Sequence, residues 1–301
     1  EKNILSLDAQ TAIWNITAQT KKAFFDLLTA QDELNLAKKT VEIAMSLKNL
    51  SDKKFKAGDI SKLGVLKAEV ELSNAKTNVV EAERNMFNAT KRLQTVMGTT
   101  GTPLQKIVPI PVTDVPLLKL EKLEELLLKN YPDLQAQKSI VNLSLLKVKE
   151  AKRKMIPDID LSIGYKRLPA TDDDTIQAGI SLPLPFFNRN QGNIIEAKEL
   201  SHKSKDDEAA ARNKLLLQLD NAYSMYASTR ELVRSFINTI VPQAEESLKM
   251  SKQGYEHGEF DFLEVLDAQR TLVTANVSYL KALNNLFTSM TEIERLVGVK
   301  I

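Results

Sequence analysis

Apolar side chains recur every seven residues along two stretches of the chain, with a second apolar position three residues after each. Between residues 65 and 96 the larger row is Val65, Leu72, Val79, Met86 and Leu93, and the smaller row is Ala68, Ala75, Ala82, Ala89 and Val96. The same two rows return between residues 265 and 296, where they begin with Val265 and Ala268. Heptad spacing of this kind predicts helices that pack as coiled coils.

The segment "FKAGDISKLGVLKAEVEL" at residues 55–72 returns two hundred positions later as "YEHGEFDFLEVLDAQRTL". Gly58 and Gly258 stand where a helix commonly ends in a left-handed residue, and Ser61 and Asp261 follow as expected N-caps of a returning helix. The repeated segment therefore predicts the tips of two helical hairpins.

Long stretches of helical periodicity lead into each tip, from about residue 7 to 54 and from residue 190 to 253. The return helix of the second hairpin is expected at residues 261–298. Pro242 removes one helical hydrogen bond and predicts a kink or break in the second long helix. A third apolar row at Leu266, Val273, Leu280 and Phe287 lies beside the seam, so we expect more than two helices to pack together.

Between the hairpins the apolar period changes to two residues. The alternating positions are Ile159, Leu161, Ile163 and Tyr165 in one run and Ile176, Ala178, Ile180 and Leu182 in the next. These runs predict a β-hairpin over residues 158–184, with strands of about the 9 to 11 residues that a tilted membrane strand needs. A soluble hairpin with one face on a protein core gives the same pattern, so the strands alone leave membrane insertion open.

The composition narrows the classes of function. The 301 residues hold 41 Lys and Arg against 39 Asp and Glu, and a formal charge of +2 gives no electrostatic footprint for nucleic acid. There is no cysteine, which excludes disulfides and cysteine metal sites. His202 and His257 lack the spacing of metal ligands, and no nucleophilic triad or phosphate-binding loop is evident. We therefore expect no enzyme activity, no cofactor and no metal site.

Two further phrases, "VPQAEESLKMSKQGYEHG" and "ISLPLPFFNRNQGNIIEAK", extend the pattern of the tips to essentially the whole chain. The sequence resembles the TolC-like outer-membrane efflux factors of the outer membrane efflux protein family, and the second phrase is most similar to the CzcC-like heavy-metal branch. The resemblance implies a mainly α fold of long antiparallel coiled-coil hairpins with a two-fold internal repeat. It also implies one β-hairpin that contributes to an outer-membrane barrel, and a trimeric α-barrel tunnel.

The function implied by this resemblance is the channel component of a tripartite efflux system, a passive conduit for heavy-metal cations or other small toxic compounds. The implied location is the outer membrane and periplasm of a Gram-negative-type bacterium. The implied partners are two further copies of the chain, outer-membrane lipid, a periplasmic adaptor (membrane fusion protein) and, through it, an inner-membrane pump of the resistance-nodulation-division (RND) type. The alternatives are a periplasmic coiled-coil adaptor and a structural helical-hairpin protein without channel activity.

The resemblance places two kinds of site at the hairpin tips. The docking surface for the adaptor comprises Gly58, Asp59, Ile60, Ser61, Lys62, Leu63, Gly258, Glu259, Phe260, Asp261, Phe262 and Leu263. Phe260 and Phe262 favour contact with a partner, because a solvated turn needs no aromatic pair. A periplasmic gate is expected from Tyr255, Glu264 and Asp267. The alternatives are a capping box of Asp261 with Glu264, and a helix-end plug at Tyr255.

The expected organisation is a first hairpin in residues 1–98, an equatorial connector with a short helix in residues 99–130, and a second repeat in residues 131–301. The second repeat begins with a helix and a strand pair that the first repeat does not supply. We therefore expect one helix and one strand pair to precede Glu1 in the complete protein.

Overall fold

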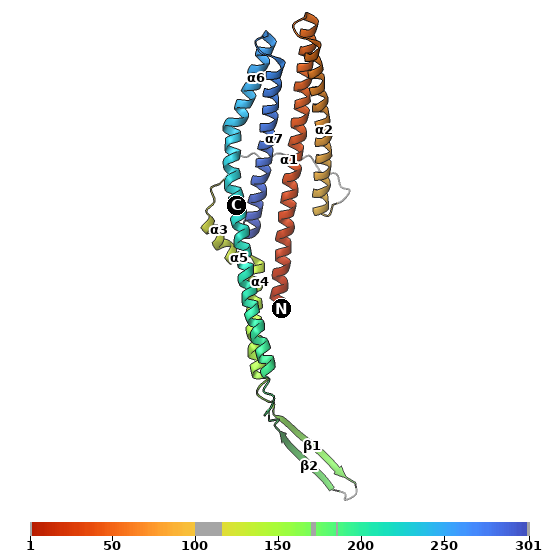
Figure 1. The fold of residues 1–301 in the computed structure, drawn as a ribbon. Coiled ribbons are helices and arrows are strands. Elements are labelled where there is room, and N and C mark those ends of the chain that lie inside the picture. The colour runs from red at the N-terminus through yellow and green to blue at the C-terminus, as the bar shows by residue number, and fades with distance from the viewer. Residues whose placement is uncertain (1, 100–115, 170–172, 185, 300–301) are drawn as a thin grey trace. The chain divides into compact units, whose positions relative to one another are not determined.

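The computed structural model describes residues 2–99, 116–169, 173–184 and 186–299. In chain order the elements are α1 (Lys2–Ala57), α2 (Lys62–Val96), α3 (Leu120–Asn130), α4 (Pro132–Arg153), β1 (Asp160–Leu168), β2 (Asp173–Ser181), α5 (Gln191–Ser235), the π-helical turn η1 (Phe236–Ile240), α6 (Val241–His257) and α7 (Phe262–Val297), as Figure 1 shows. Across the described ranges, every helix is too short in continuous apolar sequence to span a bilayer.

The chain divides into two compact units. The first comprises Glu1–Thr11 and Tyr131–Leu215, and the second comprises Ala12–Asn130 and Leu216–Ile301. The expected division at residues 98 and 130 is a division by sequence repeat, and it stays a prediction.

The second unit is built from two helical hairpins, α1 with α2 and α6 with α7 (Figure 1). Near the tips they share one cluster of buried side chains. It consists of Leu47 of α1, Ala68 of α2, Leu248 and Tyr255 of α6, and Phe262, Val265, Leu266 and Ala268 of α7. The hairpins therefore stabilise each other through a common core.

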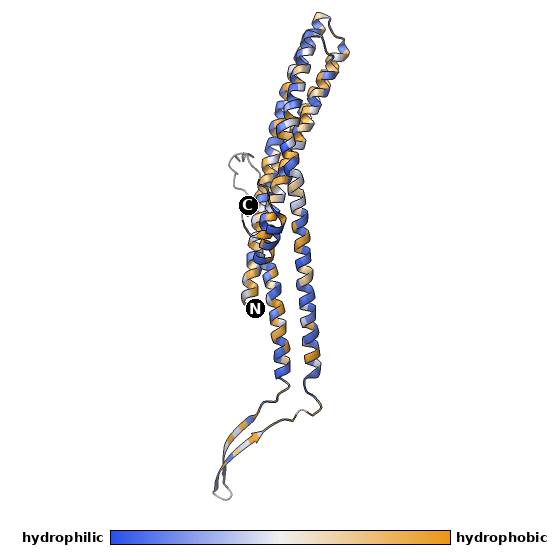
Figure 2. Ribbon diagram, turned by 90° about the vertical axis from the view of Figure 1, so that its left-hand side faces the viewer, coloured by the Kyte–Doolittle hydropathy of each residue, from blue (hydrophilic) through white to orange (hydrophobic). Residues whose placement is uncertain are grey.

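The heptad rows form the seams of these hairpins. Ala68, Ala75 and Ala82 of α2 are buried, and so are Ala268, Ala275 and Ala282 at the equivalent positions of α7. Small side chains at these positions let the neighbouring helices approach closely. Figure 2 shows the resulting stripes of apolar and polar residues along the helices. The heptad prediction is confirmed.

Contacts between α1 and α7 hold the two hairpins together farther from the tips. The rings of Phe25 and Phe287 stack with centroids 4.4 Å apart and planes 3° from parallel. Lys22 Nζ lies 2.6 Å from a carboxylate oxygen of Glu292. An offset stack of this kind contributes about 0.5 to 1.5 kcal/mol beyond the area it buries.

In the first unit, α4 and the start of α5 lie against each other. Ser144 Oγ donates to Ser201 Oγ at 3.3 Å where both side chains are buried. Asn190, with φ of 60°, stands directly before α5, and its carbonyl accepts from Ile194 N–H at 3.0 Å. Its side-chain amide donates to the carbonyl of Ala151 in α4 at 2.9 Å. Asn190 therefore stands at the N-terminus of α5 and ties it to α4.

β1 and β2 pair antiparallel, with Leu161 opposite Ile180 and Ile163 opposite Ala178. The β-hairpin prediction is confirmed, but Ile159 and Leu182 lie one residue outside the strands, so their assignment to strands is wrong. In this register they stand opposite each other at the open end. Pro183 follows Leu182 and has no N–H to donate, which ends the ladder there.

Pro242 is the second residue of α6, which follows the π-helical turn η1. Because Pro242 has no N–H to donate, the helix widens into a π-helical turn before it, and the expected break is a π-bulge rather than a gap. Residues 100–115 of the expected connector lie outside the described residues. The short helix expected after them is α3.

Candidate functional site

The two hairpin tips have nearly the same backbone. Gly58 and Gly258 have φ of 83° and 82°, in the left-handed region that disfavours side chains. The N–H of Asp59 donates to the carbonyl of Lys54 at 2.9 Å, and that of Glu259 donates to the carbonyl of Gly254 at 2.8 Å. These bonds close both helices in a Schellman-type end, as the glycines predicted.

The returning helices begin differently. Ser61 has an extended backbone at the N-cap of α2, but its side chain makes no capping hydrogen bond. At the second tip a carboxylate oxygen of Glu264 accepts from the N–H of Asp261 at 2.6 Å, which is the reciprocal contact of a capping box. Glu264 therefore stabilises the start of α7, as the capping-box alternative predicted.

A groove of about 670 Å³ lies between the tips. Its first wall comes from residues around the α1–α2 turn, and its second wall from residues around the α6–α7 turn. The walls include Lys54, Asp59, Ile60, Ser61, Leu63 and Lys67 on one side, and Tyr255, Glu256, His257, Gly258, Phe260, Asp261 and Leu263 on the other. The structure thus brings most of the expected docking residues to one place.

The apolar tip residues divide into exposed and buried sets. Leu63, Leu263 and Phe260 are 60%, 55% and 42% exposed, whereas Phe262 is only 8% exposed. Phe262 packs edge-on against Tyr255, with ring centroids 6.0 Å apart. The predicted role of Phe262 in the docking surface is therefore corrected: its side chain packs inside the tip and is not presented to a partner. Leu63, Leu263 and Phe260 are the apolar groups available to a partner.

Of the three expected gate residues, Tyr255 is buried and the two carboxylates are exposed. Tyr255 is 2% exposed, its hydroxyl lies 3.2 Å from Ser51 Oγ, and Lys54 Nζ lies 5.1 Å from its ring centroid. Asp267 is exposed on α7, one turn beyond Glu264. The gate role of these residues stays a prediction.

The strand pair presents an apolar face that none of the described residues of its unit covers. Ile163, Tyr165, Ile176 and Ile180 are exposed, and the register places Tyr165 opposite Ile176 on the same face as Ile163. A contiguous exposed apolar face marks a surface that contacts a membrane or a partner.

Sequence reasoning missed a polar network at the other end of α7. Arg295 donates to Glu292 at 2.6 Å and to Asn15 of α1 at 3.1 Å. Burial raises the pKa of Glu292, but the hydrogen bonds from Arg295 and Lys22 outweigh it and hold the pKa below its ordinary value. In the sequence, the only sign of this network was the i, i+3 spacing of Glu292 and Arg295, and such acid–base pairs are common on any helix.

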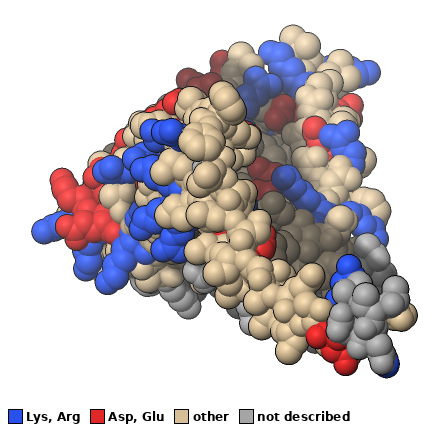
Figure 3. Space-filling view, turned by 90° about the horizontal axis from the view of Figure 1, so that it is seen from below, with Lys and Arg blue, Asp and Glu red and all other residues tan. Residues whose placement is uncertain are grey.

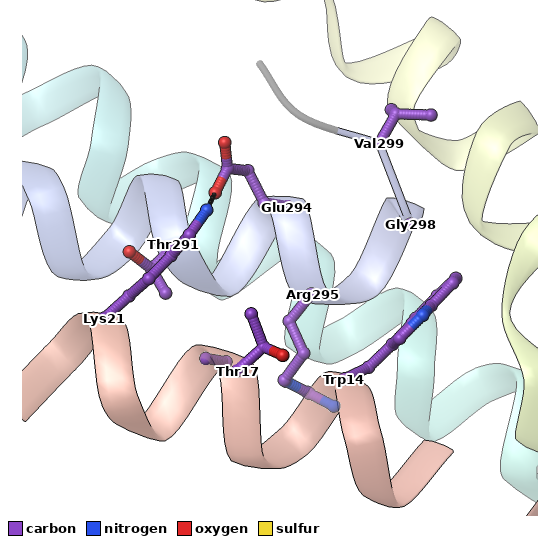
Figure 4. Close-up of a pocket in the computed structure, with 9 residues that line it drawn as sticks. Trp14, Thr17, Lys21, Thr291, Glu294, Arg295, Gly298 and Val299 are labelled. Atoms are coloured by element: carbon purple, nitrogen blue, oxygen red, sulfur yellow. Dashed lines mark hydrogen bonds and ion pairs between the residues drawn. The ribbon is translucent and has the colours of Figure 1, made fainter. Parts of the chain in front are cut away.

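Beside this network lies a cavity of about 200 Å³ (Figure 4). Trp14 and Thr17 of α1 face Thr291, Arg295 and Gly298 across it, and Lys21 pairs with Glu294. The indole of Trp14 packs against the backbone of Gly298, which ends α7 with φ of 72°. The arrangement fixes the lower end of α7 on α1.

Within the described ranges, no group of three or more His, Asp or Glu side chains is arranged to hold a metal ion. Seen from below in Figure 3, the surface carries side chains of both charge signs.

Comparisons with known proteins point to one family. The family model for outer membrane efflux protein matches residues 1–99 and 123–299. The cobalt-zinc-cadmium resistance protein CzcC of Cupriavidus metallidurans is 30% identical over 94% of this chain and 68% of its own length. Outer membrane protein TolC of Escherichia coli is 23% identical over 97% of this chain and 62% of its own length.

Solved structures share the fold. The outer-membrane channel OprN superposes with a TM-score of 0.82 at 21% identity, covering 98% of this chain and 68% of OprN. A CusC structure superposes with a TM-score of 0.76 at 18% identity, covering 98% of this chain and 73% of CusC. The chain thus spans roughly two thirds of the length of these proteins.

Proposed function

Because this chain belongs to the outer membrane efflux protein family, we propose that it is the outer-membrane channel component of a tripartite efflux system. It is a passive conduit, not an enzyme, through which small toxic compounds leave the periplasm. The observation that carries the proposal is the family match across both helical hairpins and the strand pair. The similarity to CzcC favours heavy-metal cations as the cargo.

The conduit requires several copies of the chain, and α2 carries a surface suited to bind another copy. Its outward face exposes a row of large apolar side chains: Leu63, Leu66, Val70, Val80 and Phe87. Such a row is costly to leave in water, at roughly 25 cal/mol for each Å² of apolar surface. Three copies that bury this row against one another's helices form the proposed tunnel.

The exposed apolar face of β1 and β2 suits contact with outer-membrane lipid. Its cross-strand pairs, such as Leu161 with Ile180, place apolar groups side by side on one face. Ser162 and Gln177, on the opposite face, are polar and stay hydrated. In this proposal the hairpin tips bind a periplasmic adaptor, which links the channel to an inner-membrane RND pump.

Assembly tests the proposal directly. In detergent, sedimentation should give a protein mass three times the 33.7 kDa of one chain. Val80→Glu places a charge in the exposed row of α2 and should shift the mass toward that of the monomer. Asn78→Glu is the matched control, because Asn78 is exposed but lies two residues before Val80 and so on a different side of the helix. A single-chain mass for the unaltered protein contradicts the trimer.

Transport is tested in cells that lack this channel. Restoring the chain should lower the accumulation of cobalt, zinc or cadmium ions, and the Val80→Glu chain should not. Equal metal accumulation with and without the chain argues against export of metal cations.

A further inference from the structure

The two tips share a backbone but carry opposite charges. In residues 53–67 the ionisable side chains are Lys53, Lys54, Lys56, Asp59, Lys62 and Lys67, and five lysines against one aspartate give a formal charge of +4. In the equivalent residues 253–267 the charged side chains are Glu256, Glu259, Asp261, Glu264 and Asp267, which give −5 with His257 neutral. Each tip alone departs farther from neutrality than the whole chain at +2.

Within the described tips, the opposite charges do not form ion pairs with each other. Among the described residues, no ion pair joins the two tips, and the nearest pair between the hairpins is Arg270 with Glu71 at 3.4 Å, beyond the tip segments. Lys54 is half-buried over the ring of Tyr255, and the other charged side chains of both tips are exposed. The opposite fields of the tips are therefore directed at whatever occupies the space around them.

The two walls of the groove between the tips carry different charged side chains. Lys54 and Lys67 line the wall that belongs to the first tip, and Glu256 and Asp261 line the wall that belongs to the second. Exposed Leu63 and Leu263 add apolar contact area on the two walls. Asp59 also lines the first wall, so an occupant meets two lysines and one aspartate on one side and two carboxylates on the other.

We propose that the groove orients its partner electrostatically: the occupant is a helical-hairpin tip of the partner protein, with carboxylates on the edge that faces Lys54 and Lys67 and with Lys or Arg on the edge that faces Glu256 and Asp261. This inference rests on the proposed docking function and adds the partner's charge pattern and its single orientation. Complementary charge across an interface fixes orientation and rejects the reversed arrangement, in which like charges meet.

The chain contains no cysteine, so a single introduced thiol reports contact with one wall. Ser61→Cys places it on the basic wall and His257→Cys on the acidic wall, and both changes leave the lysines and carboxylates in place. The probe is a synthetic two-helix hairpin peptide with glutamates along one outer edge, lysines along the other and a bromoacetyl group on the glutamate edge. A second peptide carries the bromoacetyl group on the lysine edge.

The glutamate-edge peptide should alkylate the Ser61→Cys chain at least about fivefold faster than the His257→Cys chain at low salt, and the lysine-edge peptide should show the reverse. Both preferences should fade in roughly 0.5 M salt, where the Debye length falls below about 5 Å. Equal rates at the two positions, or preferences that ignore salt, overturn the proposal.

A charge exchange gives the sharper test. Lys67→Glu with Glu256→Lys reverses one charge on each wall without altering the net charge, and it should move the glutamate-edge peptide toward the acidic-wall position. Lys149→Glu with Glu199→Lys is the matched control at exposed positions of the first unit, and it should leave the orientation unchanged. An orientation that survives the groove exchange overturns the proposal.

A second copy of this chain is the competing occupant. If it fills the groove, mixed Ser61→Cys and His257→Cys chains will form disulfides between copies without any peptide, and the proposal fails. The mass and metal-accumulation measurements do not depend on peptide orientation, so a failure here is distinguishable from a failure of the channel function.

Discussion

Three glycines with left-handed backbone allow a graded test of how the helices of this protein end. Gly58, Gly258 and Gly298 have φ of 83°, 82° and 72°. A Cβ added at Gly58 or Gly258 meets no atom within 4 Å, whereas one at Gly298 comes within 2.0 Å of the Trp14 ring. Substitution by alanine therefore isolates backbone strain at the tips and combines strain with a steric clash at Gly298.

The magnitudes follow from these distances. An L-residue in the left-handed region costs about 1 to 2 kcal/mol, which alanine partly offsets by lowering the entropy of the unfolded chain. We expect Gly58→Ala and Gly258→Ala each to lower the free energy of unfolding by about 1 kcal/mol. At Gly298 the displaced indole adds roughly 1 to 3 kcal/mol of overpacking. Gly298→Ala should therefore cost about 2 to 4 kcal/mol.

Thermal unfolding followed by far-ultraviolet circular dichroism measures these losses. For a protein of this size, each kcal/mol lowers the midpoint by roughly 1 to 2 °C. Gly192→Ala is the control, because Gly192 lies in a helix with ordinary φ and has nothing within 4 Å of an added Cβ. It should leave the midpoint unchanged or raise it.

A double-mutant cycle with Trp14→Ala decides whether the clash is the cause. In that background Gly298→Ala should cost only the backbone strain of about 1 kcal/mol. The reasoning fails if Gly298→Ala costs no more than Gly258→Ala in the unaltered chain, or if removing the indole leaves its cost unchanged.

Three further changes probe the interior. Tyr255→Phe removes only the hydroxyl contact with Ser51 and should cost about 0.5 to 1.5 kcal/mol in chemical denaturation, and a loss above about 3 kcal/mol would mean that the ring itself has moved. The pKa of Glu292 is lowered in the folded chain, so its carboxylate adds stability above pH 4.5 that disappears as pH falls through the folded pKa. Glu292→Gln should therefore weaken the loss of stability at acid pH, measured as the free energy of unfolding against pH. An unchanged acid dependence contradicts the role of Arg295. Burial raises the pKa of Asp32, so its charge opposes folding at neutral pH. Asp32→Asn should therefore stabilise the chain at pH 7 and lose that advantage as pH falls below the folded pKa. A destabilised variant at pH 7 argues against this assignment.

Much of the fold was predictable because its signals are local. The heptad rows from Val65 and Val265 fixed the buried faces of α2 and α7, and the shift to a period of two at Ile159 located the strand pair. The strand ends were less certain, because pairing stops where Pro183 cannot donate a hydrogen bond to the neighbouring strand.

The candidate site was predictable in position but not in detail. Phe260 and Phe262 are two residues apart and look equivalent in the sequence, yet Phe262 enters the core while Phe260 remains 42% exposed. The difference depends on Tyr255, which packs against Phe262 from the preceding helix. Tyr255 lies close to both phenylalanines in the sequence, but that spacing does not show which of them its ring contacts.

The sequence by itself determined the two reversals at Gly58 and Gly258, the seams of the hairpins and the opposite charges of the tips. These features depend on backbone preference, on periodicity and on the charge of individual side chains, all of which act over a few neighbouring residues. Only the tertiary structure decided that the two tips share one groove, that Tyr255 is a core residue and that Trp14 closes over Gly298. Those contacts join residues about two hundred or more positions apart, and they form because the hairpins bury apolar surface against each other.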